Sequence, residues 1–317
     1  MTTSTEPATK PPGRPRRAKV RPGDRNFSWA TRAAGVLILI VLAGVAAFLV
    51  REAIPAFRAD PAEIDGGEGF FAYVWPLVFG TLVAAFIALI IATPLALGIA
   101  LFISHYAPRR MAQGLGYVVD LLAAIPSVVY GLWGIQWLAP NVRGTWEWLA
   151  DNLGFIPLFA GPASATGRTM MTAGVVLAVM ILPIITAIAR EVFLQTPTLH
   201  QEAALALGAT RWEMIRMAVL PFGRPGLISG VMLGLGRALG ETMAVAMVLS
   251  TGGFTWSMVS SGNNTIAAEI ALDFPESAGI ETNTLIAAGL VLFVITLAVN
   301  MLARWIVARR EAFSGAN

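Results

Sequence analysis

The chain has 317 residues, of which 56% are hydrophobic and 13% are charged, whereas a soluble domain carries about 25% charged residues. It contains no Cys, which excludes a disulfide scaffold, a Cys-based zinc site and a thiol nucleophile. The charged residues are too few to cover a soluble protein of this size, so much of the surface is expected to face lipid.

Six apolar segments are long enough to cross a bilayer, because about 20 helical residues span its hydrocarbon core. They are residues 33–50, 70–104, 114–138, 169–189, 226–250 and 284–302. The sequence therefore predicts an all-α polytopic membrane protein with six transmembrane helices. Pro94, Pro126 and Pro183 fall inside these segments and are expected to bend them.

The charges predict how these helices are oriented. Residues 1–32 hold eight Lys or Arg against two acidic residues, and the positive-inside rule places them in the cytosol. An even number of spans then places both termini in the cytosol. We expect a disordered basic tail at 1–32, a first helix with its external link at 33–69, a core at 70–310 and a short tail at 311–317. Two external loops, 139–168 and 251–282, are long enough to dock a partner.

The polar loop at 196–224 predicts two short helices in the cytosol. Thr198 and Gln201 fit a capping box that begins the first helix, and Gly208 is placed to end it in a left-handed turn. Thr210 and Glu213 fit a second capping box. Ordering such a unit costs about 1 kcal/mol per residue or more, so something must pack on it. Two interpretations remain: a helix pair lying on lipid headgroups, or a docking site for a cytosolic partner.

The fifth apolar segment carries two charges on one face. At about 100° per residue, six small or charged residues fall within an arc of roughly 80°. These are Gly226, Gly230, Gly234, Arg237, Glu241 and Ala244. We expect this face to turn inward, and Glu241 to pair with Arg237 one turn away. The pair either fixes helix packing or forms part of an anion pathway, because the Arg fork matches phosphate oxygens.

A third charge, Asp120, lies in the segment 114–138. We expect it to reach the cytosolic interface and pair with Arg109 or Arg110, with a pairing to Arg237 as the alternative. Gating or packing roles are also possible for Asp120 and for four other residues of the apolar segments. Those four are Pro126, Gly230, Gly234 and Gly240.

The chain lacks the residues needed to hydrolyse ATP itself. A phosphate-binding loop of the type Gly-x-x-x-x-Gly-Lys-Ser/Thr is absent, and the only lysines are Lys10 and Lys19 in the N-terminal tail. There is also no Gly-x-Ser-x-Gly nucleophile motif. The sequence therefore predicts a protein without enzymatic activity or cofactor of its own, whose energy comes from another protein.

Two motifs resemble known permeases. Glu202-Ala203-Ala204, Gly208 and Leu220-Pro221 match the EAA loop of permease subunits in binding-protein-dependent ABC importers, although Ala218 stands where that family has Ile. We expect Pro221 to stop the second helix of the loop. Arg237-Ala238-Leu239-Gly240-Glu241-Thr242 and Ile125-Pro126-Ser127-Val128-Val129-Tyr130-Gly131 are similar to motifs of the Pst-type phosphate importers. The stretch Arg51-Glu52-Ala53-Ile54-Pro55 resembles the C subunit of that group more than its A subunit.

The resemblance implies a permease of the MetI-like fold in an inner membrane, with Arg237 and Glu241 in the phosphate path. It also implies three kinds of partner: a homologous second permease similar to an A subunit, a pair of ATPase subunits that bind ATP and Mg, and an external phosphate-binding protein. The EAA loop would fit a groove on the ATPase. Two alternatives remain: an ABC permease for another oxyanion or small solute, and a secondary carrier coupled to an ion gradient.

Overall fold

The computed structural model describes residues 22–250 and 252–311, with side chains described up to residue 305. Every regular element within these ranges is a helix, which confirms the predicted all-α class. Residues 1–21 and 312–317, which make up most of the two predicted tails, lie outside the described residues. The chain divides after Phe48 into two compact units, and each unit is described by itself.

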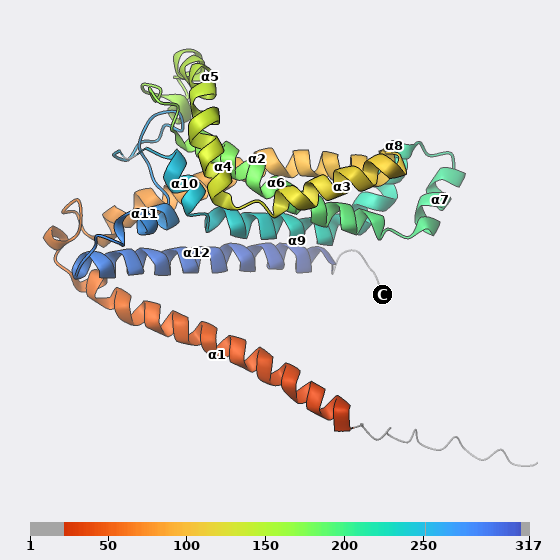
Figure 1. Ribbon diagram of the computed structural model, residues 1–317, viewed down its shortest axis with the longest axis horizontal. Helices are drawn as coiled ribbons and strands as arrows, with labels where there is room; N and C mark the ends of the chain where they lie inside the picture. The colour runs from red at the N-terminus through yellow and green to blue at the C-terminus, as the bar shows by residue number, and fades with distance from the viewer. Residues whose placement is uncertain (1–21, 251, 312–317) are drawn as a thin grey trace, which may run out of the picture. The chain divides into compact units, whose positions relative to one another are not determined.

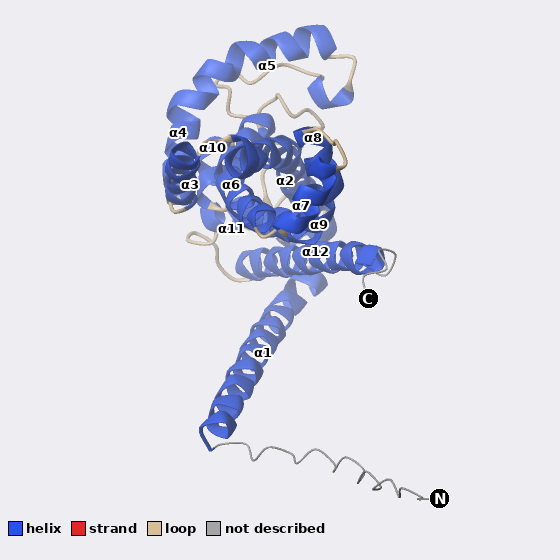
Figure 2. Cartoon of the chain, turned by 90° about the vertical axis from the view of Figure 1, so that its right-hand side faces the viewer, coloured by secondary structure: helices blue, strands red, loops and turns tan. Residues whose placement is uncertain are grey.

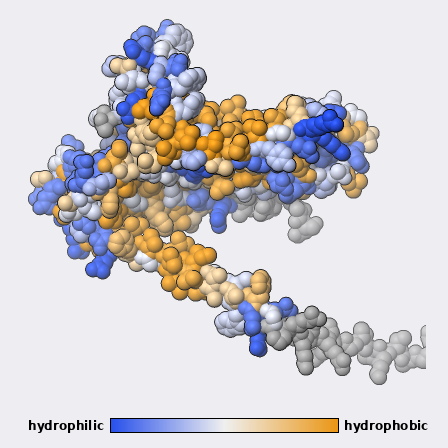
Figure 3. All heavy atoms as spheres, viewed as in Figure 1, coloured by the Kyte–Doolittle hydropathy of each residue, from blue (hydrophilic) through white to orange (hydrophobic). Residues whose placement is uncertain are grey.

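The first unit is the part of helix α1 (Pro22–Arg58) that precedes Leu49. The helix begins before the predicted end of the tail, so residues 22–32 are helical rather than disordered. Pro22 occupies the first helical position, where its missing N–H is not needed, and Asp24 is favourable in the first turn. The large apolar side chains between Val36 and Phe48 are exposed, as expected for a helix facing lipid (Figure 3).

The second unit is built around helix α6, which packs against α2, α3 and α9 (Figure 2). The bounds of these helices are α2 (Phe70–Leu101), α3 (Arg109–Ala123), α6 (Met170–Leu194) and α9 (Leu220–Leu239). Every fourth residue of α2 from Ala84 to Ala100 is an Ala with 0–1% exposure. Small residues at this spacing let helix backbones approach closely in a membrane protein. Helices α2 and α6 remain single helices through Pro94 and Pro183.

The third predicted span is not straight. Helix α3 ends at Ala123, and the chain turns by 91° before it continues as α4 (Ser127–Trp133), the π-helical turn η3 (Gly134–Leu138) and α5 (Ala139–Leu153). Pro126 lies at the break because it has no N–H and disfavours a helical conformation at the residue before it. The predicted bend at Pro126 is therefore confirmed. The predicted loop at 139–168 is instead helical over its first half.

The remaining elements lie at the two ends of this bundle or along its side. They are η1 (Pro61–Glu63), η2 (Phe102–Tyr106), η4 (Pro157–Phe159), α7 (Thr198–Ala206), α8 (Arg211–Met214), η5 (Ile215–Val219), α10 (Met243–Val248), α11 (Ile266–Asp273) and α12 (Ile280–Glu311). Helices α7 and α8 lie at one end, here called the α7 end, while α5 and α11 lie at the other, the α5 end; α12 runs beside α9 (Figure 1). Among the described residues, five helices are long and apolar enough to cross a membrane, or six if the bent segment counts as one span.

Candidate functional site

The first helix of the polar loop is α7, and it ends as predicted at Gly208. Gly208 has a φ of +86°, in the left-handed region that favours glycine, and no atom lies within 4 Å of the place a Cβ would take. Its N–H donates to the carbonyl of Leu205 at 3.0 Å, and the N–H of Ala209 donates to the carbonyl of Ala204 at 3.2 Å. These bonds satisfy carbonyls at the end of α7 and fix the turn toward α8.

The start of α7 differs from the predicted capping box. Pro197 is the N-cap residue, with an extended ψ of 129°, and Thr198 is already helical. The hydroxyl of Thr198 is therefore one position too late to cap the helix. Gln201 instead donates through Nε2 to the carbonyl of Thr196 at 3.1 Å, which holds the helix against the chain that precedes it.

The second capping box is confirmed. The N–H of Glu213 donates to Oγ1 of Thr210 at 3.3 Å, and the N–H of Thr210 donates to Oε2 of Glu213 at 2.7 Å. Pro221, however, does not stop the helix, because α8, η5 and α9 form one continuous helix from Arg211 to Leu239. The N–H of Leu220 bonds to the carbonyl of Ile215 in a widened π turn. That turn accommodates the ring and the missing N–H of Pro221 in the next position.

The EAA residues divide between an exposed and a packed side of α7. Glu202 and Ala203 are exposed, whereas Ala204 packs against a buried cluster that contains Phe193. Leu207 next to the turn is 90% exposed, which is unusual for a large apolar side chain in an ordered loop. The loop therefore has a firm attachment to the bundle and an unfilled apolar surface at its tip. Both interpretations of the loop, a site for a protein partner and a helix pair on lipid headgroups, remain compatible with this surface.

The glycine face of α9 packs directly on α6. A Cβ on Gly230 would lie 3.1 Å from Cγ2 of Ile188, and a Cβ on Gly234 would lie 3.0 Å from Cδ1 of Ile185. Both distances are shorter than the ordinary separation of carbon atoms, about 3.5–4.0 Å. The predicted inward orientation of this face is confirmed, and Gly230 and Gly234 serve helix packing.

The predicted helix over 226–250 is interrupted between Arg237 and Glu241, the two residues that were expected to form an ion pair. Helix α9 ends at Leu239, Gly240 is its C-cap, and α10 begins only at Met243. Glu241 is 9% exposed, and its Oε1 accepts the N–H of Ala244 at 3.1 Å, at the N-terminus of α10. A carboxylate is favourable at this end of a helix.

The expected pairing of Glu241 with Arg237 is therefore wrong in this structure. Within the described residues, the only ion pair joins Arg143 to Glu147 at 2.7 Å. The interruption at Gly240 removes the one-turn spacing on which the pairing depended. The carboxylate of Glu241 is bound by backbone instead.

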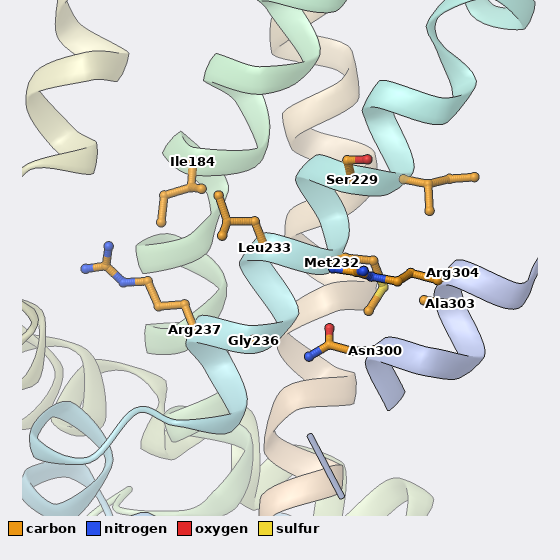
Figure 4. A pocket seen from close by; sticks show the side chains of 10 residues that line it. Ile184, Ser229, Met232, Leu233, Gly236, Arg237, Asn300, Ala303 and Arg304 are labelled. Carbon is orange, nitrogen blue, oxygen red and sulfur yellow. The ribbon is translucent and has the colours of Figure 1, made fainter. Parts of the chain in front are cut away.

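Arg237 lies in a large apolar cavity between helices. The cavity has a volume of about 850 Å³ and is lined by α6, α9 and α12, including Ile184, Leu233, Asn300 and Arg304. Arg237 extends from the last turn of α9 away from α12, whereas Arg304 extends from α12 toward Met232 of α9 (Figure 4). Arg237 is half-buried, and it brings a guanidinium with five N–H donors to a mainly apolar wall. Such a group can bind an oxyanion inside the bundle.

Asp120 is exposed on α3 and lies nearer the α7 end than Pro126. It lines a cavity of about 480 Å³ together with Arg109 and Arg190. It forms no ion pair with Arg109, Arg110 or Arg237 among the described residues, so the expected pairing is wrong.

Arg168 is a structural residue that the sequence did not indicate. It lies before α6, and its guanidinium donates to carbonyls at the C-terminal end of α10. Nη2 reaches the carbonyls of Met247 at 3.2 Å and of Leu249, while Nε reaches that of Val248 at 3.5 Å. Together with Glu241 at the other end, Arg168 gives α10 an acid at its N-terminus and a base at its C-terminus. The contacts cross about 80 residues of chain, so no local pattern predicts them.

A partly buried carboxylate lies at the α5 end on α11. Glu269 accepts hydrogen bonds from Nδ2 of Asn264 at 2.5 Å and from the hydroxyl of Tyr73 at 3.4 Å. Burial raises the pKa of Glu269 above its ordinary value, and the nearby charge of Asp273 raises it further. The hydrogen bond from Asn264 lowers this pKa but does not cancel the effect of burial.

The chain belongs to the family of binding-protein-dependent transport system inner membrane components, whose model matches residues 92–312. This family consists of membrane-embedded transport subunits and not of enzymes, which agrees with the prediction from the sequence. The family and the long apolar helices together define a multi-pass membrane protein.

Particular relatives carry a more specific description. The phosphate transport system permease proteins PstC 2 of Mycobacterium tuberculosis and Mycobacterium bovis are 46% identical over 318 residues, covering 95% of this chain and 97% of each relative. The PstC protein of Mycobacterium leprae is 43% identical, covering 82% of this chain and 85% of that protein. These relatives agree with the motif resemblance to the C subunit.

Solved structures agree with the fold. A chain of a bacterial alginate ABC transporter, in complex with an alginate-bound periplasmic protein, superposes with a TM-score of 0.58 at 16% identity, covering 90% of this chain and 96% of that one. A second chain, from a bacterial importer of the acidic polysaccharide alginate, gives a TM-score of 0.54 at 18% identity, covering 89% and 99%. At these identities the likeness concerns the fold alone, and it confirms an ABC permease architecture.

Proposed function

We propose that this chain is the membrane-spanning permease subunit of an ATP-driven importer of inorganic phosphate, of the PstC type. The observation that carries the proposal is Arg237, a half-buried arginine that lines an open and mainly apolar cavity between α6, α9 and α12. A phosphate anion that crosses such a wall needs a complementary charge, and the Arg fork matches its oxygens. The relatives described as phosphate permeases, at 43–46% identity, support the same substrate.

The proposed assembly needs three partners. A second permease similar to PstA would complete the pathway, and an external binding protein similar to PstS would deliver phosphate. A pair of ATPase subunits similar to PstB would bind ATP and Mg and would dock on α7, where Leu207 exposes an apolar surface. We propose that the α7 end and both termini lie in the cytosol, which the basic charge of the N-terminal tail supports.

The structure suggests how force reaches the pathway. Closure of the ATPases would move α7 and α8, and the continuous helix from Arg211 to Leu239 would carry that motion to Arg237. We propose that Arg237 binds phosphate while the cavity is closed on one side and releases it when the cavity opens toward the α7 end. The side chain of Glu241 accepts the N–H of Ala244 and so fixes the N-terminus of α10, just beyond the end of α9 that carries Arg237.

Uptake of radioactive phosphate tests the proposal. The chain is expressed with its partner genes in cells that lack their own phosphate importers, and Arg237→Ala is compared with Arg237→Lys at equal membrane levels. We expect Arg237→Ala to reduce uptake by about tenfold or more and Arg237→Lys to retain part of it, because Lys keeps the charge but loses the fork. Normal uptake by Arg237→Ala would refute the role of this residue. Stronger inhibition by molybdate or sulfate than by unlabelled phosphate would refute the substrate.

A further inference from the structure

A second cavity, separate from the one that Arg237 lines, lies at the α7 end. It is formed by η2, by α3 from Arg109 to Asp120 and by the C-terminal end of α6, and its volume is about 480 Å³. Two arginines, Arg109 and Arg190, line it together with Ser104 and Gln113. No residue of this cavity belongs to the pathway cavity.

Arg190 is the central residue of this cavity. Its Nε is buried and has no hydrogen-bond partner among the described residues. It also lacks a salt bridge, since the single ion pair of the described region lies elsewhere. Burying a guanidinium nitrogen without a hydrogen-bond partner is unfavourable, because the nitrogen loses its bonds to water and gains none in return. The charge of this guanidinium is therefore not neutralised by an acidic side chain among the described residues, and the cavity beside it can admit an anion.

The packing around Arg190 makes room for its guanidinium. A Cβ at Gly116 of α3 would collide with Nη1 of Arg190 and would lie 3.1 Å from its Cζ. The absence of a side chain at Gly116 therefore allows Nη1 of Arg190 to approach the backbone of α3 closely. By contrast, Gly114 on the same helix has no atom within 4 Å of the place its Cβ would take. A side chain at position 116 would therefore displace Arg190, whereas a side chain at position 114 would not.

We propose that this cavity is a binding site for a phosphate group, separate from the transport pathway. Two guanidinium groups offer forked donors to phosphate oxygens, and the amide of Gln113 adds a further donor. With the proposed orientation the site opens on the cytosolic side, where the ligand is either free phosphate or the headgroup of an anionic lipid. Asp120 lines the same cavity, so its negative charge weakens binding of the anion.

Binding to the full-length chain tests the site. The protein is purified into nanodiscs of neutral phosphatidylcholine, and binding of radioactive inorganic phosphate is measured by flow dialysis in an Arg237→Gln background, which removes the pathway arginine. We expect Arg190→Gln and Arg109→Gln to weaken binding by at least about tenfold, since each removes a charge-assisted pair. Arg110→Gln is the matched control, because Arg110 neighbours Arg109 but does not line the cavity. Asp120→Asn should strengthen binding.

Two further measurements separate the sources and guard against misfolding. Lipids retained from native membranes are counted by native mass spectrometry. The ligand is a lipid headgroup if Arg190→Gln loses phosphatidylglycerol or cardiolipin and the chain with Arg190 shows no saturable binding of phosphate. Gly116→Ala should displace the guanidinium and weaken binding, while Gly114→Ala should not. Equal binding of phosphate and equal retention of lipid in Arg190→Gln and the unmodified chain would overturn the proposal. Because Arg237 is absent from the binding assay, this result would leave the transport proposal untouched.

Discussion

The packing of α9 on α6 predicts opposite effects for two glycines that lie two residues apart. A Cβ at Gly234 would lie 3.0 Å from both Cδ1 and Cγ1 of Ile185, whereas a Cβ at Gly236 would meet no atom within 4 Å. Ile185 is fully buried, so its side chain has no free space into which it can move. Replacing each glycine by alanine therefore compares the same chemical change with and without a steric conflict.

The expected magnitudes follow from two terms. Alanine in place of glycine within a helix raises the free energy of unfolding by about 1 kcal/mol, because the unfolded chain loses conformational freedom. Gly236→Ala should show up to this gain. Overpacking in a close-packed interior lowers the free energy of unfolding by about 1–3 kcal/mol, so Gly234→Ala should show a net loss of about 0–2 kcal/mol. The two variants should thus differ by about 1–3 kcal/mol.

Reversible unfolding in mixed micelles of a mild detergent and dodecyl sulfate, followed by tryptophan fluorescence, measures this difference. Phosphate uptake at equal membrane levels provides a second measurement, because a shift of α9 also moves Arg237. We expect Gly234→Ala to lose uptake and stability together. If the two variants had equal stability, the close contact between α9 and α6 would not exist as described, and the reasoning would fail.

Three further predictions concern residues outside this helix contact. Arg168→Gln should lower the free energy of unfolding by about 1.5–3 kcal/mol, because charged hydrogen bonds to α10 are lost. The control is Arg143→Gln, which removes only an exposed ion pair and should change the free energy of unfolding by less than about 1 kcal/mol. Equal losses in the two variants would argue against the role of Arg168. Gly208→Ala should reduce phosphate uptake, since a left-handed residue other than glycine costs about 1–2 kcal/mol. Gly208→Asn should retain more uptake than Gly208→Ala, because Asn tolerates this conformation better. Higher uptake by Gly208→Ala than by Gly208→Asn would contradict the left-handed turn. Glu269 has a raised pKa in the folded state, so the folded chain binds the proton more tightly, and the free energy of unfolding should fall as pH rises above the ordinary value of 4.5. Glu269→Gln should flatten that fall in a pH series of unfolding curves, and an unchanged slope would count against it.

Local rules predicted those parts of the site that depend on neighbouring residues alone. The turn at Gly208 and the reciprocal bonds between Thr210 and Glu213 each involve residues at most five positions apart. The periodicity of α9 also predicted which side would face inward, because close packing of helices in a membrane requires small residues on one face. These features need only the composition and the helical repeat.

Longer-range contacts account for the predictions that were wrong. Pro221 was expected to stop a helix, but the π turn that precedes it changes the spacing of the backbone bonds, and no residue type signals such a turn. The break at Gly240 depends on the capping of α10 by Glu241 and by Arg168, which comes from a distant segment. Likewise, nothing near Arg190 in the sequence shows that Gly116 packs against it.

The continuity of the helix at Pro221 and its interruption at Gly240 change how motion can pass through the molecule. If Pro221 ended the helix, the coupling loop and Arg237 would belong to separate rigid bodies, and a hinge between them would absorb part of any displacement. Instead one helix of 29 residues joins Arg211 to Leu239, a length of about 43 Å at 1.5 Å per residue. The helix is interrupted only beyond Arg237, at Gly240. In the proposed transport cycle, a movement of α8 therefore moves Arg237 with it, while α10, held by Arg168, can stay in place.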